Sequence, residues 1–576
     1  MRNVGLGSAI VAATIFCALG ACGGGDDSSG TGPSGGSGDG GAGVTGDAAS
    51  PPADSCEAFG HFGKPAVTFD LPVVGSGAAA TLVYADVQKS FPSVDWTHLD
   101  RLYLPAGKYP SLMLGNLPAR DPAHPLVITN KGGQVFVGDN PKGNYLWSMG
   151  GTCTGSGACT SVSSGWVLTG RYDPDSQTGD VGFQGHRCGK YASSQDTYGI
   201  VSDDGFAFDA PYLHMGIAVQ GATQFEIEYV EIRRSGFAGI RLLNPRASGD
   251  AAQPMEDVKV HDVYVHDTGG EGFYFGWTGA PPSNLFPGLQ IYNCRILRTG
   301  NEALQIQDLG EGSHVYNNVF AAGGLHWLDN GLGLYQDNNS QIQMRSGNIE
   351  IDHNVAIDGA GSVVVSFTQP EPGDADVHAK VHDDYFANTL DVGLSLNGTP
   401  TTTSTYAFEN DLFTGMAYGY QPINSKANAP GAVFNINVTS PVSFTNDSWD
   451  GTRELVNGIT GGNGTKDNTT GSGNVHGAFT PIAFENAGFP IDNPGHHLTA
   501  YVPTITTAGA TAMGQPVSYK KGDVVTYGAA PDLYQASADT TAGPPDAHPE
   551  AWTKLPTPID DVRVKSDSPY AAMGVK

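Results

Sequence analysis

The sequence predicts an all-β fold of stacked coils, and two observations support it. Stretches that begin at Phe225, Val258 and Leu289 repeat one template: alternating apolar residues, a glycine-rich break, and a second alternating run. A looser copy begins at Ser313 and another at Ile349. Alternation with a period of two is typical of half-buried strands. The first three copies start 33 and 31 residues apart, and this spacing indicates stacked coils rather than a sandwich.

The first 21 residues read as an export signal. Arg2 precedes an apolar run, Val4 to Leu19, which is shorter than a typical membrane-spanning helix. The small residues just before Cys22 resemble the signal of bacterial lipoproteins. This resemblance implies an exported lipoprotein, held at the outer membrane or cell surface by a lipid anchor on Cys22. An ordinary secretory signal that is cut nearby is the alternative.

A spacer follows this signal. Residues 22–55 are rich in Gly, Ser and Asp and have almost no apolar side chains. They cannot bury enough surface to offset the entropy of ordering. We therefore expect a flexible tether that holds the folded part of the chain away from a membrane.

The composition fits an exported, strand-rich protein. Glycine accounts for 80 of the 576 residues, and charged residues for only 15%. The net charge of −29 argues against a nucleic-acid partner. Separately, we expect the protein to be a monomer. Cys153 and Cys159 flank a short Gly/Ser/Thr loop and are expected to form a disulfide. Cys294 falls in an apolar position of the template and is expected to be a buried thiol.

Residues 56–502 are assigned to the coils. Near their start, LPAGKY and ITNKGG resemble the opening coils of right-handed parallel β-helix proteins, the pectate-lyase-like superfamily. Further on, GFAGIRL, GEGFYF and NGLGLY are similar to the repeat of that superfamily. The resemblance implies a right-handed parallel β-helix. It says little about activity, because the superfamily contains lyases, hydrolases, epimerases and non-catalytic adhesins.

A different pattern covers residues 503–556. This β-rich segment resembles a small chitin- and cellulose-type carbohydrate-binding module, with Tyr519, Tyr534 and Trp552 among the matching residues. Where that family has an exposed aromatic pair, this chain has Ser-Ala-Asp at 537–539. Aromatic platforms stack on sugars, so sugar binding and a purely structural role both stay open. Residues 557–576 look like the closing segment of the β-helix, which makes the module an insert near the C-terminus.

Aligning the copies at the glycine-rich break places two glutamates in one column. Glu271 and Glu302 each precede the second strand of a copy. Neighbouring coils stack about 5 Å apart, and a carboxylate pair at that distance is the spacing of retaining glycosidases. One glutamate would protonate the leaving oxygen and the other would attack or activate water. The alternative is that both side chains cap backbone N–H groups in their turns.

The outward positions that follow these glutamates gather side chains suited to sugar hydroxyls. Aromatic faces and amides bind sugars better than a plain charged surface does. Asp308 has a second possible role, because with Asp329 it would supply oxygen ligands to Ca²⁺. The candidate substrate-binding residues are Arg241, Tyr274, Trp277, Gln305, Gln307 and Asp308.

Two further features carry alternatives. An insertion at 325–333 breaks the template and contains His326, which is a candidate proton shuttle or an ordinary loop residue. A second column aligns Arg234, Asp267 and Arg298. Alternating signs favour a ladder of salt bridges, while a lyase would use such an arginine as a base beside Ca²⁺.

Together these features predict a surface-tethered carbohydrate-active protein. The leading hypothesis is a polysaccharide lyase or glycoside hydrolase that acts on extracellular polysaccharide. The alternative is a non-catalytic lipoprotein that binds or adheres to glycans.

Overall fold

The computed structural model describes most of the chain between residues 62 and 571. The predicted signal, Cys22 and the tether lie outside the described residues. None of the helices among the described residues is long and apolar enough to cross a membrane. The gaps within this range are 139–145, 154–156, 172–185, 187–196, 206–213, 277–282, 330–337, 361, 369–373, 391, 399–402, 417–431, 451–455, 458–467, 478–479, 481, 487–497, 507–512, 529–531, 558–559 and 569–570.

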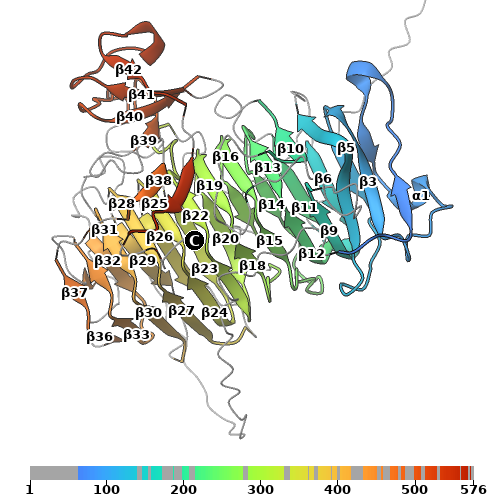
Figure 1. Ribbon diagram of the computed structural model, residues 1–576. Helices are drawn as coiled ribbons and strands as arrows, with labels where there is room; N and C mark the ends of the chain where they lie inside the picture. Colours follow the sequence, from blue (N-terminus) through green and yellow to red (C-terminus); the bar gives the residue numbers. More distant parts are fainter. Residues whose placement is uncertain are drawn as a thin grey trace, which may run out of the picture.

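Three ladders of parallel strands run along the molecule (Figure 1). Ladder 1 consists of β1 (Thr68–Asp70), β3 (Arg101–Tyr109), β5 (Leu126–Gly138), β9 (Ser163–Thr169), β12 (Ala222–Glu228), β15 (Lys259–His261), β18 (Gln290–Tyr292), β21 (Ser313–Tyr316), β24 (Gly347–Asp352), β27 (Val377–His382), β30 (Thr405–Glu409), β33 (Val442–Thr445) and β36 (Thr469–Ser472).

Ladder 2 begins on the second halves of β3 and β5 and continues through β10 (Ile200–Asp203), β13 (Val230–Arg233), β16 (Tyr264–Thr268), β19 (Arg295–Thr299), β22 (Val319–Ala321), β25 (Val355–Gly359), β28 (Tyr385–Thr389), β31 (Leu412–Thr414), β34 (Ser448–Trp449) and β37 (Val475–His476). Ladder 3 consists of β2 (Leu82–Tyr84), β4 (Leu112–Gly115), β6 (Trp147–Gly150), β11 (Ile217–Gln220), β14 (Ile240–Leu242), β17 (Phe273–Phe275), β20 (Leu304–Leu309), β23 (Ser340–Met344), β26 (Ser362–Thr368), β29 (Val392–Gly398), β32 (Ala432–Asn437) and β35 (Val456–Asn457).

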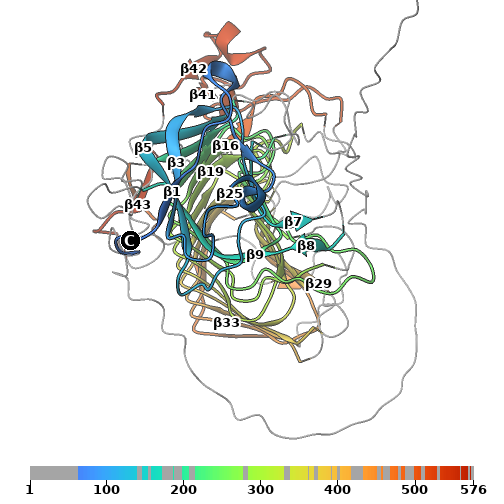
Figure 2. The same ribbon diagram turned by 90° about the vertical axis from the view of Figure 1, so that its right-hand side faces the viewer.

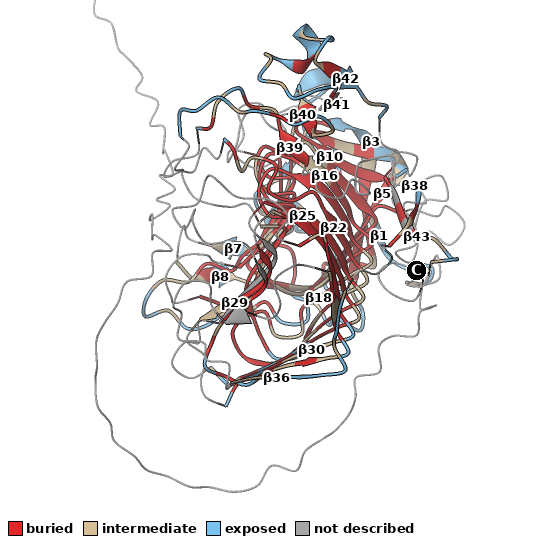
Figure 3. Ribbon diagram, turned by 90° about the vertical axis from the view of Figure 1, so that its left-hand side faces the viewer, coloured by how far each residue is buried: buried red, intermediate tan, exposed pale blue. Residues whose placement is uncertain are grey.

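Most coils contribute one strand to each ladder, while β3 and β5 each extend across ladders 1 and 2, and the coils stack around a common core. Seen from the two ends of the stack, the strands surround a common interior (Figures 2 and 3), and most strand residues are coloured as buried in Figure 3. The apolar residues of the template, such as Ile240, Phe273 and Leu304, are fully buried. The chain is therefore a parallel β-helix, and the predicted all-β fold class is confirmed. The short helices in the described part of the chain are η1 (Gly77–Ala79), α1 (Val87–Ser90) and η4 (Pro545–Ala547).

A column of polar residues runs through the interior at the turn between ladders 1 and 2. The backbone N–H of each member donates to the side-chain Oδ1 of the member in the next coil, over 2.5–3.1 Å. Asn318 and Asn354 stack in this column, and three aspartates extend it. The interior column consists of Cys294, Asn318, Asn354, Asp384, Asp411, Asp447 and Asn474.

Two small features lie outside the ladders near the N-terminal half. β7 (Thr152–Cys153) and β8 (Cys159–Ser161) form an antiparallel pair. A disulfide joins Cys153 to Cys159 within it, which is the pair that the sequence suggested. Cys294 is a buried free thiol.

The module is a small sheet of its own, placed beyond the body of the coils in Figure 1. β39 (Leu498–Ala500) pairs with β40 (Val524–Tyr527), which continues to β41 (Asp532–Ala536) and β42 (Trp552–Lys554). β39 precedes the boundary expected at residue 503, because the chain enters the sheet before the sequence pattern changes.

The C-terminal segment returns to the coils, as expected if the module is an insert. However, its described residues form no further coil. β43 (Asp561–Val564) pairs antiparallel with β38 (Phe484–Asn486). Val562 and Phe484 pack in one cluster with Tyr264 and Leu297 of ladder 2. The segment therefore lies as a strap across the outer face of ladder 2 and covers apolar side chains there.

Candidate functional site

The outward side chains of ladder 3 form the column that the sequence predicted. Arg241 of β14 pairs with Tyr274 of β17, which pairs with Gln305 of β20. The next strand adds Gln341 in register. These residues alternate with buried core residues, so their side chains point away from the core. Arg241, Tyr274 and Gln341 are half-buried, whereas Gln305 is only 2% exposed.

The same outward face continues over later coils that the sequence reasoning missed. Ser395 of β29 lies opposite Asn435 of β32. The amide of Asn397 donates to the Ser395 hydroxyl over 2.6 Å, and that of Asn435 over 3.4 Å. The signal was present as alternation in SLNG and FNIN, but these coils were not aligned with the others. We call this set the amide face; it consists of Arg241, Tyr274, Gln305, Gln341, Ser395, Asn397 and Asn435.

The two candidate glutamates lie in neighbouring coils at the edge of this face. Gly272 N–H donates to the Glu302 carbonyl over 3.0 Å, and their strands pair two residues further on. Both side chains are fully buried, so the expected position in an open strip is not what the structure shows. The alternation rule governs strands, and both glutamates precede a strand, in a turn that folds back into the coil.

The Glu271 carboxyl is only partly satisfied. Its Oε1 accepts a hydrogen bond from the Asn301 amide over 3.3 Å, while its Oε2 is buried with no hydrogen-bond partner among the described residues. Burial raises the pKa of Glu271 to about 7. A carboxyl in this condition is a proton donor near neutral pH.

Gln307 and Asp308 also belong to the interior rather than to the accessible surface. They are 3% and 1% exposed. The Asp308 carboxylate accepts hydrogen bonds from the Ser283 hydroxyl and from Arg345 Nη1, both over 2.6 Å. Because Arg345 already balances this charge, Asp308 is not open to the calcium ion that the sequence suggested.

Asp329, the other expected calcium ligand, makes a separate contact. It is exposed and accepts a hydrogen bond from the Thr506 hydroxyl. Among the described residues, two groups bring three potential metal ligands together, and neither includes Asp308 or Asp329. Trp277, the remaining candidate for sugar contact, lies outside the described residues.

The loop that contains His326 supports the module. The Leu325 carbonyl accepts from the backbone N–H of Ala500 over 2.9 Å, and the Leu328 carbonyl accepts from Thr506 N–H over 3.0 Å. Burial lowers the pKa of His326 to about 4, so its imidazole is neutral at physiological pH. The insertion that interrupts the repeat therefore holds the module against the coils. These contacts account for the insertion without a catalytic role.

The arginine column on ladder 2 is a structural ion network. Arg298 donates to Asp267 over 2.7 and 3.1 Å and to Asp560 of the C-terminal strap over 2.8 and 2.9 Å. Burial opposes ionisation of Asp267, but the charge of Arg298 outweighs it and holds the pKa of Asp267 well below its usual range. Arg234 pairs with Asp203 instead, over 2.6 and 2.8 Å. An arginine held by two carboxylates is poorly suited to act as a base.

The module uses its matching aromatic residues as a core. Tyr519, Tyr534 and Trp552 are 3%, 8% and 2% exposed and pack in one cluster. Tyr501 packs edge-on against Trp552, with ring centroids 5.9 Å apart. Of the two roles left open by the sequence, the structural one accounts for these three residues.

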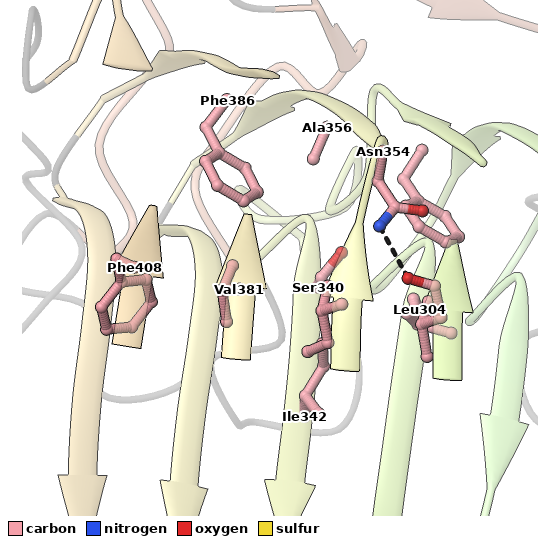
Figure 4. A pocket seen from close by; sticks show the side chains of 11 residues that line it. Leu304, Ser340, Ile342, Asn354, Ala356, Val381, Phe386 and Phe408 are labelled. Atoms are coloured by element: carbon pink, nitrogen blue, oxygen red, sulfur yellow. Dashed lines mark hydrogen bonds between the residues drawn. The ribbon is translucent and has the colours of Figure 1, made fainter. Parts of the chain in front are cut away.

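One cavity of about 20 Å³ lies between the ladders, inside the coils (Figure 4). Its lining includes Leu304, Ile342, Phe386 and Phe408, and the amide of Asn354 at its edge donates to the Val315 carbonyl over 2.9 Å. This space holds about one water molecule. It is a packing defect of the core and not a binding site for a sugar.

Fold and site together define a parallel β-helix protein with a polar outward face. No protein-family model matches the chain, and no curated protein matches its sequence. Among solved structures, a Geobacillus virus E2 protein, ORF18, is 10% identical with a TM-score of 0.36, over 66% of this chain and 62% of that chain.

Two polysaccharide-degrading enzymes are similar to a comparable degree. The catalytic unit of a GH87 α-1,3-glucanase from Streptomyces thermodiastaticus is 12% identical with a TM-score of 0.34, over 72% of this chain and 70% of that one. An alginate lyase from Paenibacillus is 13% identical with a TM-score of 0.29, over 69% of this chain and 99% of that one. Identities and TM-scores this low do not indicate the activity of this chain. The assignment of the fold is based on the strand pairings themselves.

Proposed function

We propose that the protein binds an extended extracellular polysaccharide along the amide face of ladder 3. The observation that carries this proposal is the register of Arg241, Tyr274, Gln305 and Gln341 in one outward column. Coil stacking repeats these groups about every 4.8 Å. Such a row offers amide donors and acceptors, an aromatic ring and a guanidinium to a polymer whose hydroxyl groups also repeat.

Binding is favoured over cleavage by the state of the candidate catalytic groups. Glu271 and Glu302 are fully buried, so neither carboxyl contacts a polymer lying on the amide face. Arg298, the candidate lyase base, is held by Asp267 and Asp560.

Polysaccharide cleavage, by a lyase or a glycoside hydrolase, is the second candidate. One observation favours it, namely the pKa of about 7 that burial gives Glu271 beside the amide face. A general acid works best with a pKa near the operating pH. Incubation with a polysaccharide panel, assayed for new reducing ends and for unsaturated uronate absorbance, tests this activity. Loss of either signal in Glu271→Gln and Glu302→Gln would assign the chemistry to the pair.

The binding proposal is tested on a glycan array with the double variant Tyr274→Ala, Gln341→Ala, at two half-buried positions of the amide face. We expect at least a tenfold loss of affinity for the preferred glycan, because an aromatic ring and an amide leave the face. The matched control is Gln290→Ala, which removes a half-buried glutamine from the outer face of ladder 1. Unchanged binding in the double variant, or equal loss in the control, would refute the assignment to ladder 3.

We also propose that the protein acts while anchored to a membrane through Cys22. The lipoprotein-like signal and the 22–55 spacer support this location. Mass spectrometry of the N-terminal peptide is expected to show acylated Cys22. In Cys22→Ser, the protein is expected to move from the membrane fraction to the soluble fraction. A mature chain that begins after residue 22 and has no lipid at its N-terminus would exclude the anchor.

A further inference from the structure

A cluster of histidines and carboxylates lies on the outer face of ladder 1, away from the amide face. Three successive coils build it through strand register. His314 of β21 pairs with Glu350 of β24, and Asp352 of β24 pairs with His382 of β27. His353 follows Asp352 at a turn position with φ of 54°. We call His314, Glu350, Asp352, His353 and His382 the histidine cluster.

The members of the cluster are already in contact with one another. The Asp352 carboxylate lies 2.6 Å from His353 Nδ1 and also contacts His314 Nε2. His382 Nε2 lies 3.0 Å from the Glu350 carboxylate. One potential ligand atom each from Asp352, His353 and His382 lies within 4.8 Å of the others. Imidazoles and carboxylates therefore converge on one small volume.

We propose that the histidine cluster binds one divalent transition-metal cation, Zn²⁺, through Asp352, His353 and His382. Zinc lies about 2.0–2.2 Å from such ligands, so two ligand atoms on one ion are at most about 4.4 Å apart. The present ligand atoms, all within 4.8 Å of one another, exceed this limit by at most about 0.4 Å. The Glu350 carboxylate lies within reach as a fourth ligand, and a nitrogen-oxygen set of this kind selects zinc over calcium.

A second layer of contacts supports the site. A histidine that binds a metal usually donates its other ring N–H to a carboxylate, which fixes the ring. His382 has this arrangement, because its Nδ1 lies 2.8 Å from Asp383 while its Nε2 faces Glu350. The ion would replace the proton shared between His382 and Glu350. It would also join the coils that contain β24 and β27.

A comparable group on the same ladder is more enclosed and serves as a control. Glu226, Glu228 and His261 also lie within 4.8 Å of one another. The ring nitrogens of His261 are held by Asp262 at 2.9 Å and Glu226 at 3.0 Å, but its side chain is only 1% exposed. The group thus has a single imidazole, and that imidazole is enclosed. In the histidine cluster, by contrast, His353 is 31% exposed.

The test uses untagged full-length protein, stripped with a chelator and titrated with ZnCl₂ by calorimetry, with bound metal counted by mass spectrometry. We expect one zinc ion per chain with micromolar or tighter affinity. His353→Ala and His382→Gln should each weaken binding at least tenfold, and His261→Gln should bind as the wild type does. CaCl₂ should give no binding heat at this site.

Thermal denaturation with and without ZnCl₂ provides a second readout. Zinc should raise the melting temperature of the wild type and of His261→Gln, because a ligand that binds only the folded state stabilises it. If His382→Gln does not fold by circular dichroism, His353→Ala decides, since His353 stands at a partly exposed turn. Absence of bound zinc in the wild type, or wild-type affinity in His353→Ala, would overturn the proposal.

Discussion

Arg298 and Glu271 are two buried charges at different corners of neighbouring coils, and their surroundings differ. Arg298 is matched by Asp267 from the adjacent coil and by Asp560 from the C-terminal strap. Glu271 stacks beside Glu302 and has one carboxylate oxygen without a hydrogen-bond partner among the described residues. Coil stacking therefore has opposite effects. It completes an ion pair when opposite charges share a column, and it favours the neutral form of a carboxyl that it buries without a counter-charge.

The largest effect is expected from Arg298→Met. The substitution leaves Asp267 and Asp560 buried without their shared cation, and breaking a buried pair in this way destabilises a protein by about 3–5 kcal/mol. Urea denaturation measures the loss. Arg241→Met, at a half-buried position of the amide face, is the control and should change stability by about 0.5 kcal/mol or less. Equal losses in the two variants would show that the network contributes little.

An intermediate effect is expected in the interior column, where three aspartates stack in successive coils. Burial raises the pKa of Asp447 to about 7 and that of Asp411 well above its usual value. The folded state thus binds more protons than the unfolded state between about pH 4 and 7, so stability is lost as the pH rises through that window. Asp447→Asn keeps the acceptor for Asp411 N–H without the charge.

We therefore expect Asp447→Asn to stabilise the protein at pH 8 by on the order of 2 kcal/mol and to have little effect at pH 4. Melting temperatures recorded across this pH range test the difference in slope. The reverse substitution, Asn354→Asp, introduces the same charge and should steepen the loss. If neither variant changes the slope of melting temperature against pH, titration of the aspartates in the interior column does not contribute to the pH dependence of stability.

The smallest effect is expected from Glu271→Gln. Burial raises the pKa of Glu271 from its ordinary 4.5 to about 7, so the wild type loses stability as the pH rises from about 4.5 to 7, whereas glutamine does not titrate. Below pH 4.5 the variant should match the wild type within about 1 kcal/mol, and at pH 8.5 it should be the more stable. Glu256→Gln, at an exposed position, is the control variant. If Glu271→Gln is less stable than the wild type at pH 8.5, the ionised Glu271 carboxylate stabilises the fold, contrary to this prediction.

The columns that the sequence predicted were those anchored by a glycine-rich break. Arg241, Tyr274 and Gln305 align as expected because their copies have the same break and nearly equal length. The alignment failed at the next coil. There the strand that pairs with Leu304 begins at Ser340, since the insertion after Leu325 is longer than the template allows. The alternation of apolar and polar residues within a strand does not indicate how long the insertion between two strands is.

Burial of the candidate site was also beyond the sequence pattern. Period-two alternation assigns faces only within strands, and Glu271 and Glu302 stand in turns. The role of the His326 loop depended on contacts with Ala500 and Thr506, which are distant in sequence. The histidine cluster shows the same limit, because it forms from residues of three coils whose register only the structure supplies.

The C-terminal strap changes how such a molecule folds. A stack of coils is quasi-one-dimensional, and each coil needs only its neighbours. Here, however, Arg298 bonds to a residue 262 positions later in the chain. Contacts of such sequence separation slow folding, because the long loop between them must close first. During synthesis the early coils can form as the chain emerges, but this ion network is completed only after nearly the whole chain is made.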